Sequence, residues 1–229
     1  MIQAYKHILW DWNGTLLDDS QLCVDVLNHL LQQKDSSQSN LSLETYRKHF
    51  DFPVIHFYDF LGFETDATNF EAISKQFIAG YEARWLEECR LHPEVTQLLE
   101  TASEQGLSHS ILSAAHQRAL EIGTEHFGIS HYFQNLLGTD NIYAEGKVER
   151  ARAWMEQSPW DSSEVVLIGD TLHDFEVAKA IGVPCLLLAA GHCHRQRLES
   201  TQAPVFNSLH ELLATLHWGE TALRKWSLI

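Results

Sequence analysis

The chain contains few cysteines, few basic residues and no long apolar run, and each shortage excludes a class of protein. Its four cysteines form no Cys-x-x-Cys pair, so we expect reduced thiols rather than a disulfide framework. Lys and Arg number 16 against 31 Asp and Glu, a formal net charge of -15, which repels nucleic-acid phosphates and argues against a DNA or RNA partner. No apolar run of about 18 residues and no secretory signal pattern occurs. We therefore expect neither a membrane span nor export, and a cytoplasmic location.

The rest of the composition is that of a globular protein, with 45% hydrophobic and 10% aromatic residues. Its acidic balance remains compatible with a small anionic substrate, because a bound cation and backbone N–H groups can reverse the field locally. A length of 229 residues accommodates one large domain, or a domain with a smaller insertion.

Short apolar segments that predict strands alternate with segments of helical spacing along most of the chain. The predicted strands lie at 5–11, 107–113, 136–137, 165–168 and 186–188. The predicted helices after the second strand lie at 117–127, 147–157, 175–181 and 209–217. This alternation predicts the α/β fold class, with a doubly wound parallel sheet.

The long segment that follows the first strand has a different pattern. Between about 20 and 90 the apolar residues recur only at helical spacing, which predicts helices over 20–34, 42–50, 54–61 and 68–89. The simplest architecture is therefore an α/β core that is interrupted after its first strand by an all-helical cap. We expect the core to comprise 1–18 and 91–229, and the cap to comprise 19–90.

The most informative run is Asp11-Trp12-Asn13-Gly14-Thr15, which follows the first predicted strand directly. In open α/β sheets, ligand chemistry takes place outside the carboxyl ends of the strands. An aspartate at that place can attack phosphorus and form an aspartyl-phosphate. Taken alone, however, an aspartate after a strand is more often a turn residue or a helix cap.

Three further polar sites follow predicted strands in chain order, and their combination is more specific than any one of them. They are Ser113, Lys147, and the run Gly169-Asp170 with Asp174. Two carboxylates suit a divalent cation such as Mg²⁺. A lysine and a hydroxyl, helped by backbone N–H groups, stabilise charge on phosphoryl oxygens. Together with Asp11, this set predicts phosphoryl transfer.

These motifs resemble those of the haloacid dehalogenase superfamily, and the chain looks similar to its phosphoglycolate phosphatase-like branch with a small helical cap. The resemblance implies that Asp11 is the nucleophile and a Mg²⁺ ligand. It implies that the backbone carbonyl of Asn13 and the carboxylate of Asp170 also bind Mg²⁺. Asp174 would orient metal-bound water or the lysine, and is counted with the metal site. Asp18 fits the family pattern at the start of the cap hinge.

The resemblance also implies how the substrate is held. Ser113 and Lys147 would bind the transferring phosphoryl group. Around them we expect four substrate-binding residues, which are Gly14, Thr15, Ala114 and Ala115. The implied substrate is a small phosphorylated metabolite, and the implied protein is a monomer or a homodimer.

Asn13 departs from the family pattern. Phosphatases of this family usually carry an aspartate two residues after the nucleophile, where it protonates the leaving alkoxide and later activates water. An amide donates a hydrogen bond but does not exchange a proton near neutral pH. Because general acid–base catalysis contributes about 10²–10⁴-fold, we expect a slow phosphatase, or one restricted to good leaving groups such as an acyl phosphate. Two explanations stay open beside this one: His173 or His116 replaces the acid–base group, or the protein is a phospholigand binder without turnover.

A C–P hydrolase similar to phosphonoacetaldehyde hydrolase is a further alternative, since those enzymes also have Trp after the nucleophile and lack the second aspartate. They need a cap lysine, and the matching position here is Val54, with Lys48 nearby but out of register. The aromatic segment 50–58 is expected to pack the cap and to shape the leaving-group pocket through His56 and Tyr58. The segment 191–194 is predicted to be a surface loop rather than a metal cluster, and to lie near the site because it follows the predicted strand at 186–188.

Overall fold

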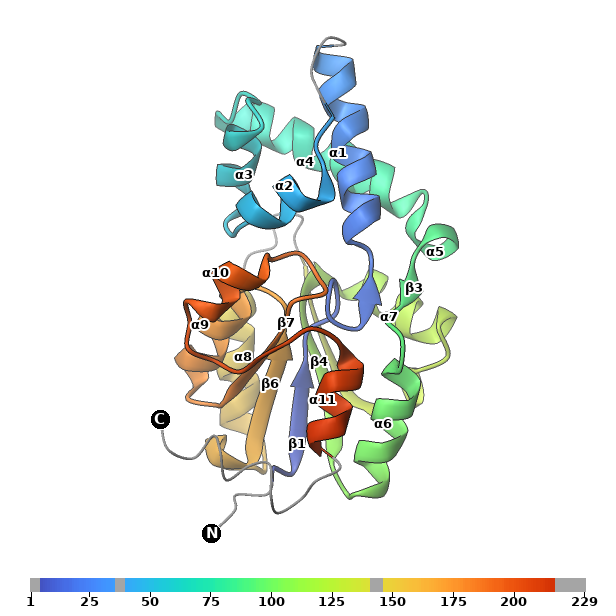
Figure 1. The fold of residues 1–229 in the computed structure, drawn as a ribbon, viewed down its shortest axis with the longest axis vertical. Coiled ribbons are helices and arrows are strands. Elements are labelled where there is room, and N and C mark those ends of the chain that lie inside the picture. Colours follow the sequence, from blue (N-terminus) through green and yellow to red (C-terminus); the bar gives the residue numbers. More distant parts are fainter. Residues whose placement is uncertain (1–4, 36–39, 141–145, 217–229) are drawn as a thin grey trace.

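The computed structural model describes residues 5–35, 40–140 and 146–216. The parts of predicted elements and domains that fall at 1–4, 36–39, 141–145 and 217–229 lie outside this description. The described chain forms an α/β part and a helical part that stands over one end of the sheet (Figure 1). The predicted fold class, a parallel α/β sheet with a helical insertion after its first strand, is confirmed.

The described residues form a parallel six-stranded sheet with the order β5-β4-β1-β6-β7-β8. Its strands are β1 (His7–Trp10), β4 (Ser108–His116), β5 (Phe133–Thr139), β6 (Val165–Gly169), β7 (Cys185–Leu188) and β8 (Val205–Phe206). The first strand lies at the centre, between β4 and β6. The strand β8 was not predicted, because two residues are too few to show a periodic pattern.

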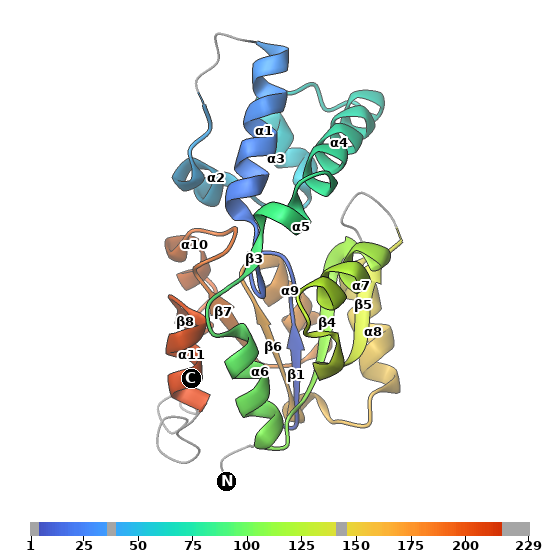
Figure 2. The same cartoon turned by 90° about the vertical axis from the view of Figure 1, so that its right-hand side faces the viewer.

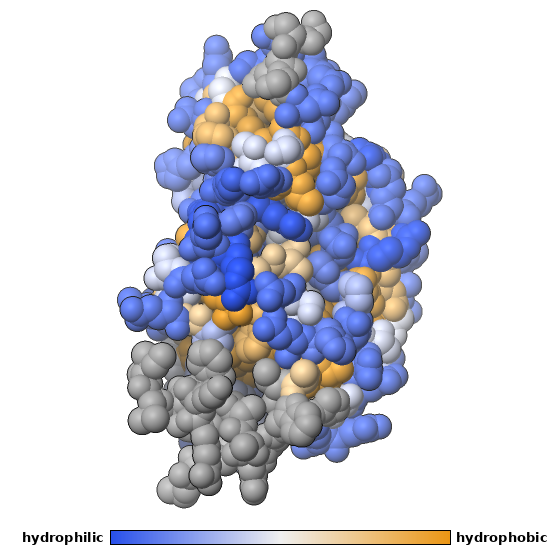
Figure 3. Space-filling view, in the orientation of Figure 1, coloured by the Kyte–Doolittle hydropathy of each residue, from blue (hydrophilic) through white to orange (hydrophobic). Residues whose placement is uncertain are grey.

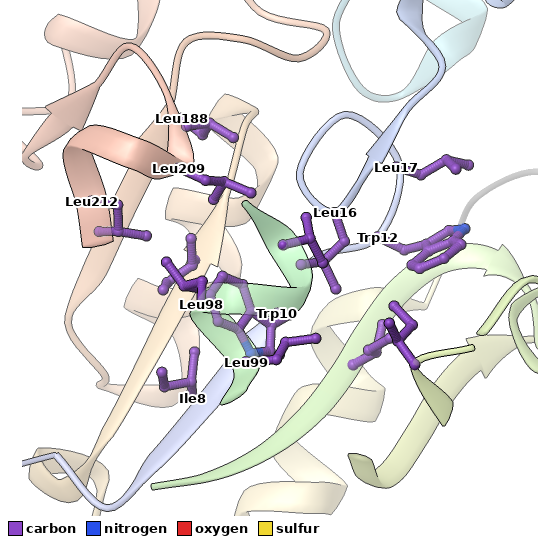
Figure 4. Packing of buried hydrophobic residues seen from close by; sticks show 14 of the residues in the cluster. Ile8, Trp10, Trp12, Leu16, Leu17, Leu98, Leu99, Leu188, Leu209 and Leu212 are labelled. Atoms are coloured by element: carbon purple, nitrogen blue, oxygen red, sulfur yellow. The ribbon is translucent and has the colours of Figure 1, made fainter. Parts of the chain in front are cut away.

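Helices cover both faces of this sheet. They are α6 (Val95–Glu104), α7 (Gln117–His126), α8 (Lys147–Gln157), α9 (Leu172–Ile181), α10 (Arg195–Glu199) and α11 (Leu209–Leu216). Alternate side chains of β1 point to opposite faces, as in any strand. Ile8 and Trp10 pack with leucines of α6 and α11 (Figure 4), whereas Leu9 packs with residues of α8 and α9. Ile8, Leu9 and Trp10 of the central strand therefore bury apolar side chains on both faces of the sheet, and the whole strand is buried.

The helical part consists of α1 (Ser20–Lys34), α2 (Leu43–His49), α3 (Val54–Phe60), α4 (Ala67–Glu82) and α5 (Trp85–Glu88). Apolar residues from α1, α2 and α3 form a cluster of their own, separate from the two clusters on the sheet. Figure 2 shows these helices above the end of the sheet at which β1 and β6 finish. The helical part therefore covers the carboxyl ends of these strands.

Two short strands join the helical part to the α/β part. The strand β2 (Leu17–Asp18) pairs antiparallel with β3 (Arg90–Leu91), so the two connecting segments run side by side. The predicted domain limits, at 18/19 and 90/91, fall at this pairing and remain a prediction. The helix predicted over 68–89 is broken at Arg84, whose backbone leaves the helical region at φ -127°.

Polar colours dominate the face shown in Figure 3, and apolar colour gathers in its upper, helical part. Among the residues described, no helix combines the length and the apolar composition that crossing a membrane requires.

Candidate active site

The sheet order brings the predicted site residues to one edge. Trp10 of β1 is in register with Ile111 of β4 and with Ile168 of β6. Asp11 follows Trp10, and its N–H donates a hydrogen bond of 2.8 Å to the carbonyl of Ile168. Asp170 follows β6 directly. The two aspartates therefore lie at the ends of neighbouring parallel strands, where the chemistry of such sheets takes place.

A buried ion-pair chain connects Asp11, Lys147 and Asp174. The ammonium of Lys147 contacts Oδ1 of Asp11, and it donates to Oδ1 of Asp174 at 2.6 Å. The exposed fractions of the three side chains are 4%, 9% and 1% for Lys147, Asp11 and Asp174. Burial by itself lowers the pKa of Lys147, but attraction to the two carboxylates outweighs it and raises the pKa above its usual value. Lys147 is therefore held as a cation beside the predicted nucleophile.

Asp170 is enclosed by backbone and by two hydrogen bonds. Its Oδ1 accepts from the hydroxyl of Thr15 at 2.9 Å, and its Oδ2 accepts from the N–H of His192 at 2.6 Å. A Cβ atom on Gly14, where φ is 76°, would lie 2.3 Å from Oδ2 of Asp170, and one on Gly191 would lie 2.1 Å from it. Only glycine at these two positions allows such an approach. Burial raises the pKa of Asp170 to about 6.

Asp174 has a structural role in addition to its contact with Lys147. It stands in the first turn of α9, where its Oδ2 accepts from the N–H and the hydroxyl of Thr171 at 2.9 Å and 2.6 Å. Burial raises the pKa of Asp174, but the nearby Lys147 ammonium outweighs it and holds the pKa below its usual value. The carboxylate is therefore both a helix cap and a partner of the site lysine.

The donor set fits a magnesium ion. Carboxylate oxygens of Asp11, Asp170 and Asp174 lie within 4.8 Å of one another, and all three residues are buried. Three buried carboxylates around a single ammonium leave an excess of negative charge, which a divalent cation would neutralise. Hard oxygen ligands of this kind suit Mg²⁺. The backbone carbonyl of Asn13 as a further ligand remains a prediction.

The side chain of Asn13 has two polar partners. Its amide Nδ2 donates to Oδ2 of Asp19 at 2.7 Å and to the hydroxyl of Tyr81 at 3.0 Å. Asp19 is buried, and its Oδ1 also accepts from the N–H of Gly14 at 3.0 Å. Asn13 is therefore one donor in a ring of donors around a buried carboxylate.

A single cavity of about 270 Å³ joins this edge of the sheet to the cap. Its α/β wall includes Asp11, Lys147 and the segment Ser113-Ala114-Ala115. Ser113 lies within β4 and not at its end, because β4 continues to His116 through a register shift. The hydroxyl oxygen of Ser113 accepts from the N–H of Ala115 at 3.0 Å.

Comparison with known proteins identifies the fold and the family. The profile of the haloacid dehalogenase-like hydrolases matches residues 8–188. The chain belongs to this family. Over 239 residues it is 22% identical to the phosphoglycolate phosphatase of Aliivibrio fischeri, covering 94% of this chain and 98% of that one. It is 28% identical to that of Vibrio parahaemolyticus over 125 residues, which span only 54% of this chain and 55% of the relative.

Solved structures of this hydrolase fold superpose over almost the whole chain. A haloacid dehalogenase-like family protein from Streptococcus pneumoniae gives a TM-score of 0.77 at 19% identity, covering 94% of this chain and all of the other, 100%. A predicted phosphoglycolate phosphatase from Haemophilus somnus gives a TM-score of 0.74 at 19% identity, covering 93% and 98%. At such identities the likeness establishes the fold.

Most residues predicted for the hydrolase site lie together in the structure. The set at the sheet edge or on the cavity wall comprises Asp11, Asn13, Ser113, Ala114, Ala115, Lys147, Asp170 and Asp174. Gly14 and Thr15 lie against Asp170 and not on the cavity wall, so their part in substrate binding remains a prediction. The catalytic roles of all these residues also remain predictions.

Of five other residues named from the sequence, three line the cavity and two do not. His116 and His173 both line the cavity, and His173 also contacts the ring of Phe52 at 5.1 Å between centroids. Lys48 does not line the cavity, and its ammonium pairs with Glu44 at 2.5 Å on the surface. Within the aromatic segment 50–58, Tyr58 lines the cavity as expected, whereas His56 is exposed and does not line it.

The roles of two buried residues beside the site, Asp19 and His192, were not found from the sequence. Asp18 was singled out, but it is exposed, and its neighbour Asp19 faces the site instead. The prediction of a surface loop at 191–194 is wrong for His192 and Cys193, which are 5% and 1% exposed. The expectation that this loop lies near the site, because it follows a parallel strand, is confirmed, since His192 lines the cavity.

His192 connects the α/β part to the cap. Its Nε2 lies 3.1 Å from Oδ1 of Asp19, and its Nδ1 lies 2.9 Å from the hydroxyl of Tyr46 on α2. Burial alone lowers the pKa of His192, but attraction to Asp19 outweighs it and raises the pKa to about 9. A buried imidazolium–carboxylate pair thus stands next to Asn13.

Proposed function

We propose that this hydrolase is a Mg²⁺-dependent phosphatase that uses Asp11 as its nucleophile on a small phosphorylated metabolite. One observation carries the proposal: Asp11 lies on the cavity wall in contact with the buried Lys147, beside Asp170 and Asp174. The names of the relatives, which include phosphoglycolate phosphatases, support the same reaction class.

The proposed reaction has two displacements at phosphorus. A carboxylate oxygen of Asp11 attacks, the ester P–O bond breaks, and the leaving alkoxide takes a proton from water. A water molecule then attacks the phosphorus of the aspartyl-phosphate, the bond to Asp11 breaks, and inorganic phosphate leaves. Lys147 and the hydroxyl of Ser113 bind the phosphoryl oxygens through both steps. When bound by the three aspartates, Mg²⁺ supplies neutralising positive charge for the carboxylate and the phosphoryl group.

The C–P hydrolase alternative receives less support. A Schiff base requires a lysine that reaches the substrate. Among the residues described, Lys147 is the lysine of the cavity wall, and it is engaged with two carboxylates. Lys48 is 46% exposed and paired with Glu44.

The test is phosphate release from a panel of alkyl, aryl and acyl phosphates, with Mg²⁺ and with EDTA. Asp11→Asn serves as the matched blank, because it keeps the shape of the side chain and removes one charge from a site with excess negative charge. We expect metal-dependent release that the variant lacks, with both proteins folded by circular dichroism. No release by folded wild-type protein that still binds Mg²⁺ would contradict the proposal and favour a phospholigand-binding protein.

A further inference from the structure

We propose that the natural leaving group is an uncharged aromatic alcohol, so that the cavity takes the phosphate monoester of a phenol. This inference rests on the proposed function and names its substrate class. Three independent features of the cavity carry it: the chemistry of the cap wall, the missing proton donor, and one unpaired hydroxyl.

The cap side of the cavity is apolar and rich in rings. It includes Leu27 of α1, Val54 and Phe57 of α3, Phe77 and Ile78 of α4, and Trp85 of α5. Aromatic side chains bind a ring through offset and edge-to-face contacts, which add to the gain from burying apolar surface. The chemistry of this wall therefore suits an apolar ring that extends from the phosphate into the cap.

The cap wall offers no counter-ion for a second anionic group. Among the lining residues described, the ionisable carboxylates from this side are Asp19 and Glu82, and no lysine or arginine from the cap joins them. The guanidinium of Arg47 on α2 does not line the cavity and donates to the carbonyls of Ala190 and Gly191 instead. The cations that line the rest of the cavity are already paired, Lys147 with Asp11 and Asp174, and His192 with Asp19. A substrate carboxylate, as in phosphoglycolate, would therefore lose its hydration here without gaining a cation of its own. The non-phosphate part of the substrate is therefore uncharged.

Asn13 favours a phenol over an aliphatic alcohol. The amide at this position donates to Asp19 and cannot protonate a leaving oxygen. A phenol has a pKa of about 10, as in tyrosine, whereas an alkyl alcohol, like water, has a far higher pKa. A phenolate therefore leaves as the anion with far less need for protonation, and it takes its proton from water afterwards.

Ser74 supplies a point of recognition inside the apolar wall. It lies on α4, is 3% exposed, and lines the cavity. Its hydroxyl has no hydrogen-bond partner among the residues described. Buried hydroxyls are normally paired, since an unmade hydrogen bond is costly. A polar substituent on the substrate ring, such as a second hydroxyl, would be its partner.

The first experiment compares kcat/KM for phenyl phosphate, 2-phosphoglycolate and acetyl phosphate in the presence of Mg²⁺. We expect phenyl phosphate to exceed 2-phosphoglycolate by at least about tenfold. Turnover of acetyl phosphate or 2-phosphoglycolate without a preference for phenyl phosphate would overturn this inference and leave the proposed function standing. Turnover of none of the three would count against the proposed function itself.

A binding measurement keeps the inference testable even without turnover. Benzylphosphonate and 3-phosphonopropionate are non-hydrolysable counterparts of phenyl phosphate and 2-phosphoglycolate. Titration calorimetry with Mg²⁺ should show benzylphosphonate binding about tenfold tighter or more. Equal or weaker binding of benzylphosphonate would overturn the inference.

Two sets of variants test the cap wall. Phe77→Arg places a cation on the wall and should shift the preference toward 3-phosphonopropionate. Phe60→Arg is the matched control, because Phe60 is 49% exposed on α3 and does not line the cavity. The polar ring substituent is tested with whichever of 3- and 4-hydroxyphenyl phosphate the wild-type protein turns over better. The ratio of kcat/KM for this substrate to that for phenyl phosphate should fall by about tenfold in Ser74→Ala. Ser74→Thr, which keeps a hydroxyl, should retain the wild-type ratio. An unchanged preference in Ser74→Ala would remove Ser74 from the substrate site.

Discussion

The side-chain amide of Asn13 donates a hydrogen bond of 2.7 Å to the buried carboxylate of Asp19. The same carboxylate accepts from the N–H of Gly14 at 3.0 Å and from the hydroxyl of Tyr81 at 2.7 Å, and it pairs with His192. An aspartate at position 13 would face this carboxylate at hydrogen-bond distance. The departure from the family pattern at Asn13 is therefore matched by its surroundings, and is not an isolated change.

The first prediction concerns the stability of this pair. Asn13→Asp should lower the free energy of unfolding by about 1–3 kcal/mol, because a donor is replaced by a second buried acceptor. The double variant Asn13→Asp with Asp19→Asn restores a donor opposite an acceptor, so its cost should be smaller than the sum of the two single costs. Urea unfolding of the four proteins gives the coupling energy. Additive costs would mean that the two side chains do not interact.

The second prediction concerns leaving-group dependence. If the lack of a proton donor at Asn13 limits turnover, Asn13→Asp should raise kcat for an alkyl phosphate by at least about tenfold, and by up to the factor of about 10²–10⁴ that is typical of acid–base catalysis. Phenyl phosphate should gain much less. Asn13→Ala, which supplies no acid, is the control and should accelerate neither substrate. Equal effects of Asn13→Asp on both substrates would contradict this account.

The third prediction concerns magnesium. Binding to the three aspartates should stabilise the folded protein, by about 2.7 kcal/mol when free Mg²⁺ is 100-fold above its Kd. Asp170→Asn should lose most of the Mg²⁺-dependent rise in Tm. Asp140→Asn is the control, because its side chain is 92% exposed and lies outside the acidic cluster. A Tm that rises equally with Mg²⁺ in Asp170→Asn would remove Asp170 from the metal site.

The elements with strong apolar periodicity could be predicted from the sequence. The helices Ser20–Lys34 and Lys147–Gln157 have the predicted bounds, because the spacing of their apolar residues follows a single face. The meeting of Asp11 with Asp170 could also be predicted, since the carboxyl ends of parallel strands share one edge of the sheet.

The rest of the site depends on contacts between distant segments, which leave no local pattern. Asp19 is one of two adjacent aspartates, and burial with contacts to distant residues such as Tyr81 and His192 distinguishes it from Asp18. Ser74 is a single serine in an amphipathic helix, and its importance comes from the cavity beside it. For such residues the sequence supplies the chemistry but not the neighbours.

The fourth prediction concerns the link between cap and core. Arg47 on α2 donates from Nε to the carbonyl of Gly191 at 2.7 Å, and its own carbonyl accepts from the N–H of His194 at 2.9 Å. Arg47→Met keeps the apolar stem and removes these side-chain bonds. Amide hydrogen exchange at 190–194 should accelerate, and kcat/KM should fall by about five- to tenfold, since this loop carries His192 and contacts Asp170.

Lys48→Met is the matched control for this link. It changes the adjacent residue, whose ammonium pairs with the exposed Glu44, and it should leave both exchange and kcat/KM unchanged. The same variant bears on C–P cleavage, which would require a cap lysine. Equal exchange rates in Arg47→Met and Lys48→Met would contradict a special role of Arg47.

The last prediction is the pH dependence of stability that arises from His7 in the central strand. Its ring stacks on Trp160 at 4.1 Å between centroids, and its Nδ1 lies 2.7 Å from the hydroxyl of Ser108. The other ring nitrogen, Nε2, has no partner among the residues described. Burial, with a smaller effect from His109 nearby, lowers the pKa of His7 to about 3. The folded protein therefore keeps this ring neutral, whereas the unfolded chain protonates it below about pH 6.5.

The direction of the effect follows from proton uptake by the unfolded state. The free energy of unfolding that the neutral His7 contributes is fully present above about pH 6.5. It is lost progressively as the pH falls toward 3. Between pH 7 and pH 5 the loss should be about 2 kcal/mol. His7→Phe retains an aromatic ring against Trp160 but cannot titrate. Between pH 7 and pH 5 the free energy of unfolding of this variant should therefore fall by about 2 kcal/mol less than that of the wild-type protein. The site carboxylates are common to both proteins and cancel in the difference. Urea unfolding at pH 7 and pH 5 measures it, and parallel losses in the two proteins would show that folding does not lower the pKa of His7.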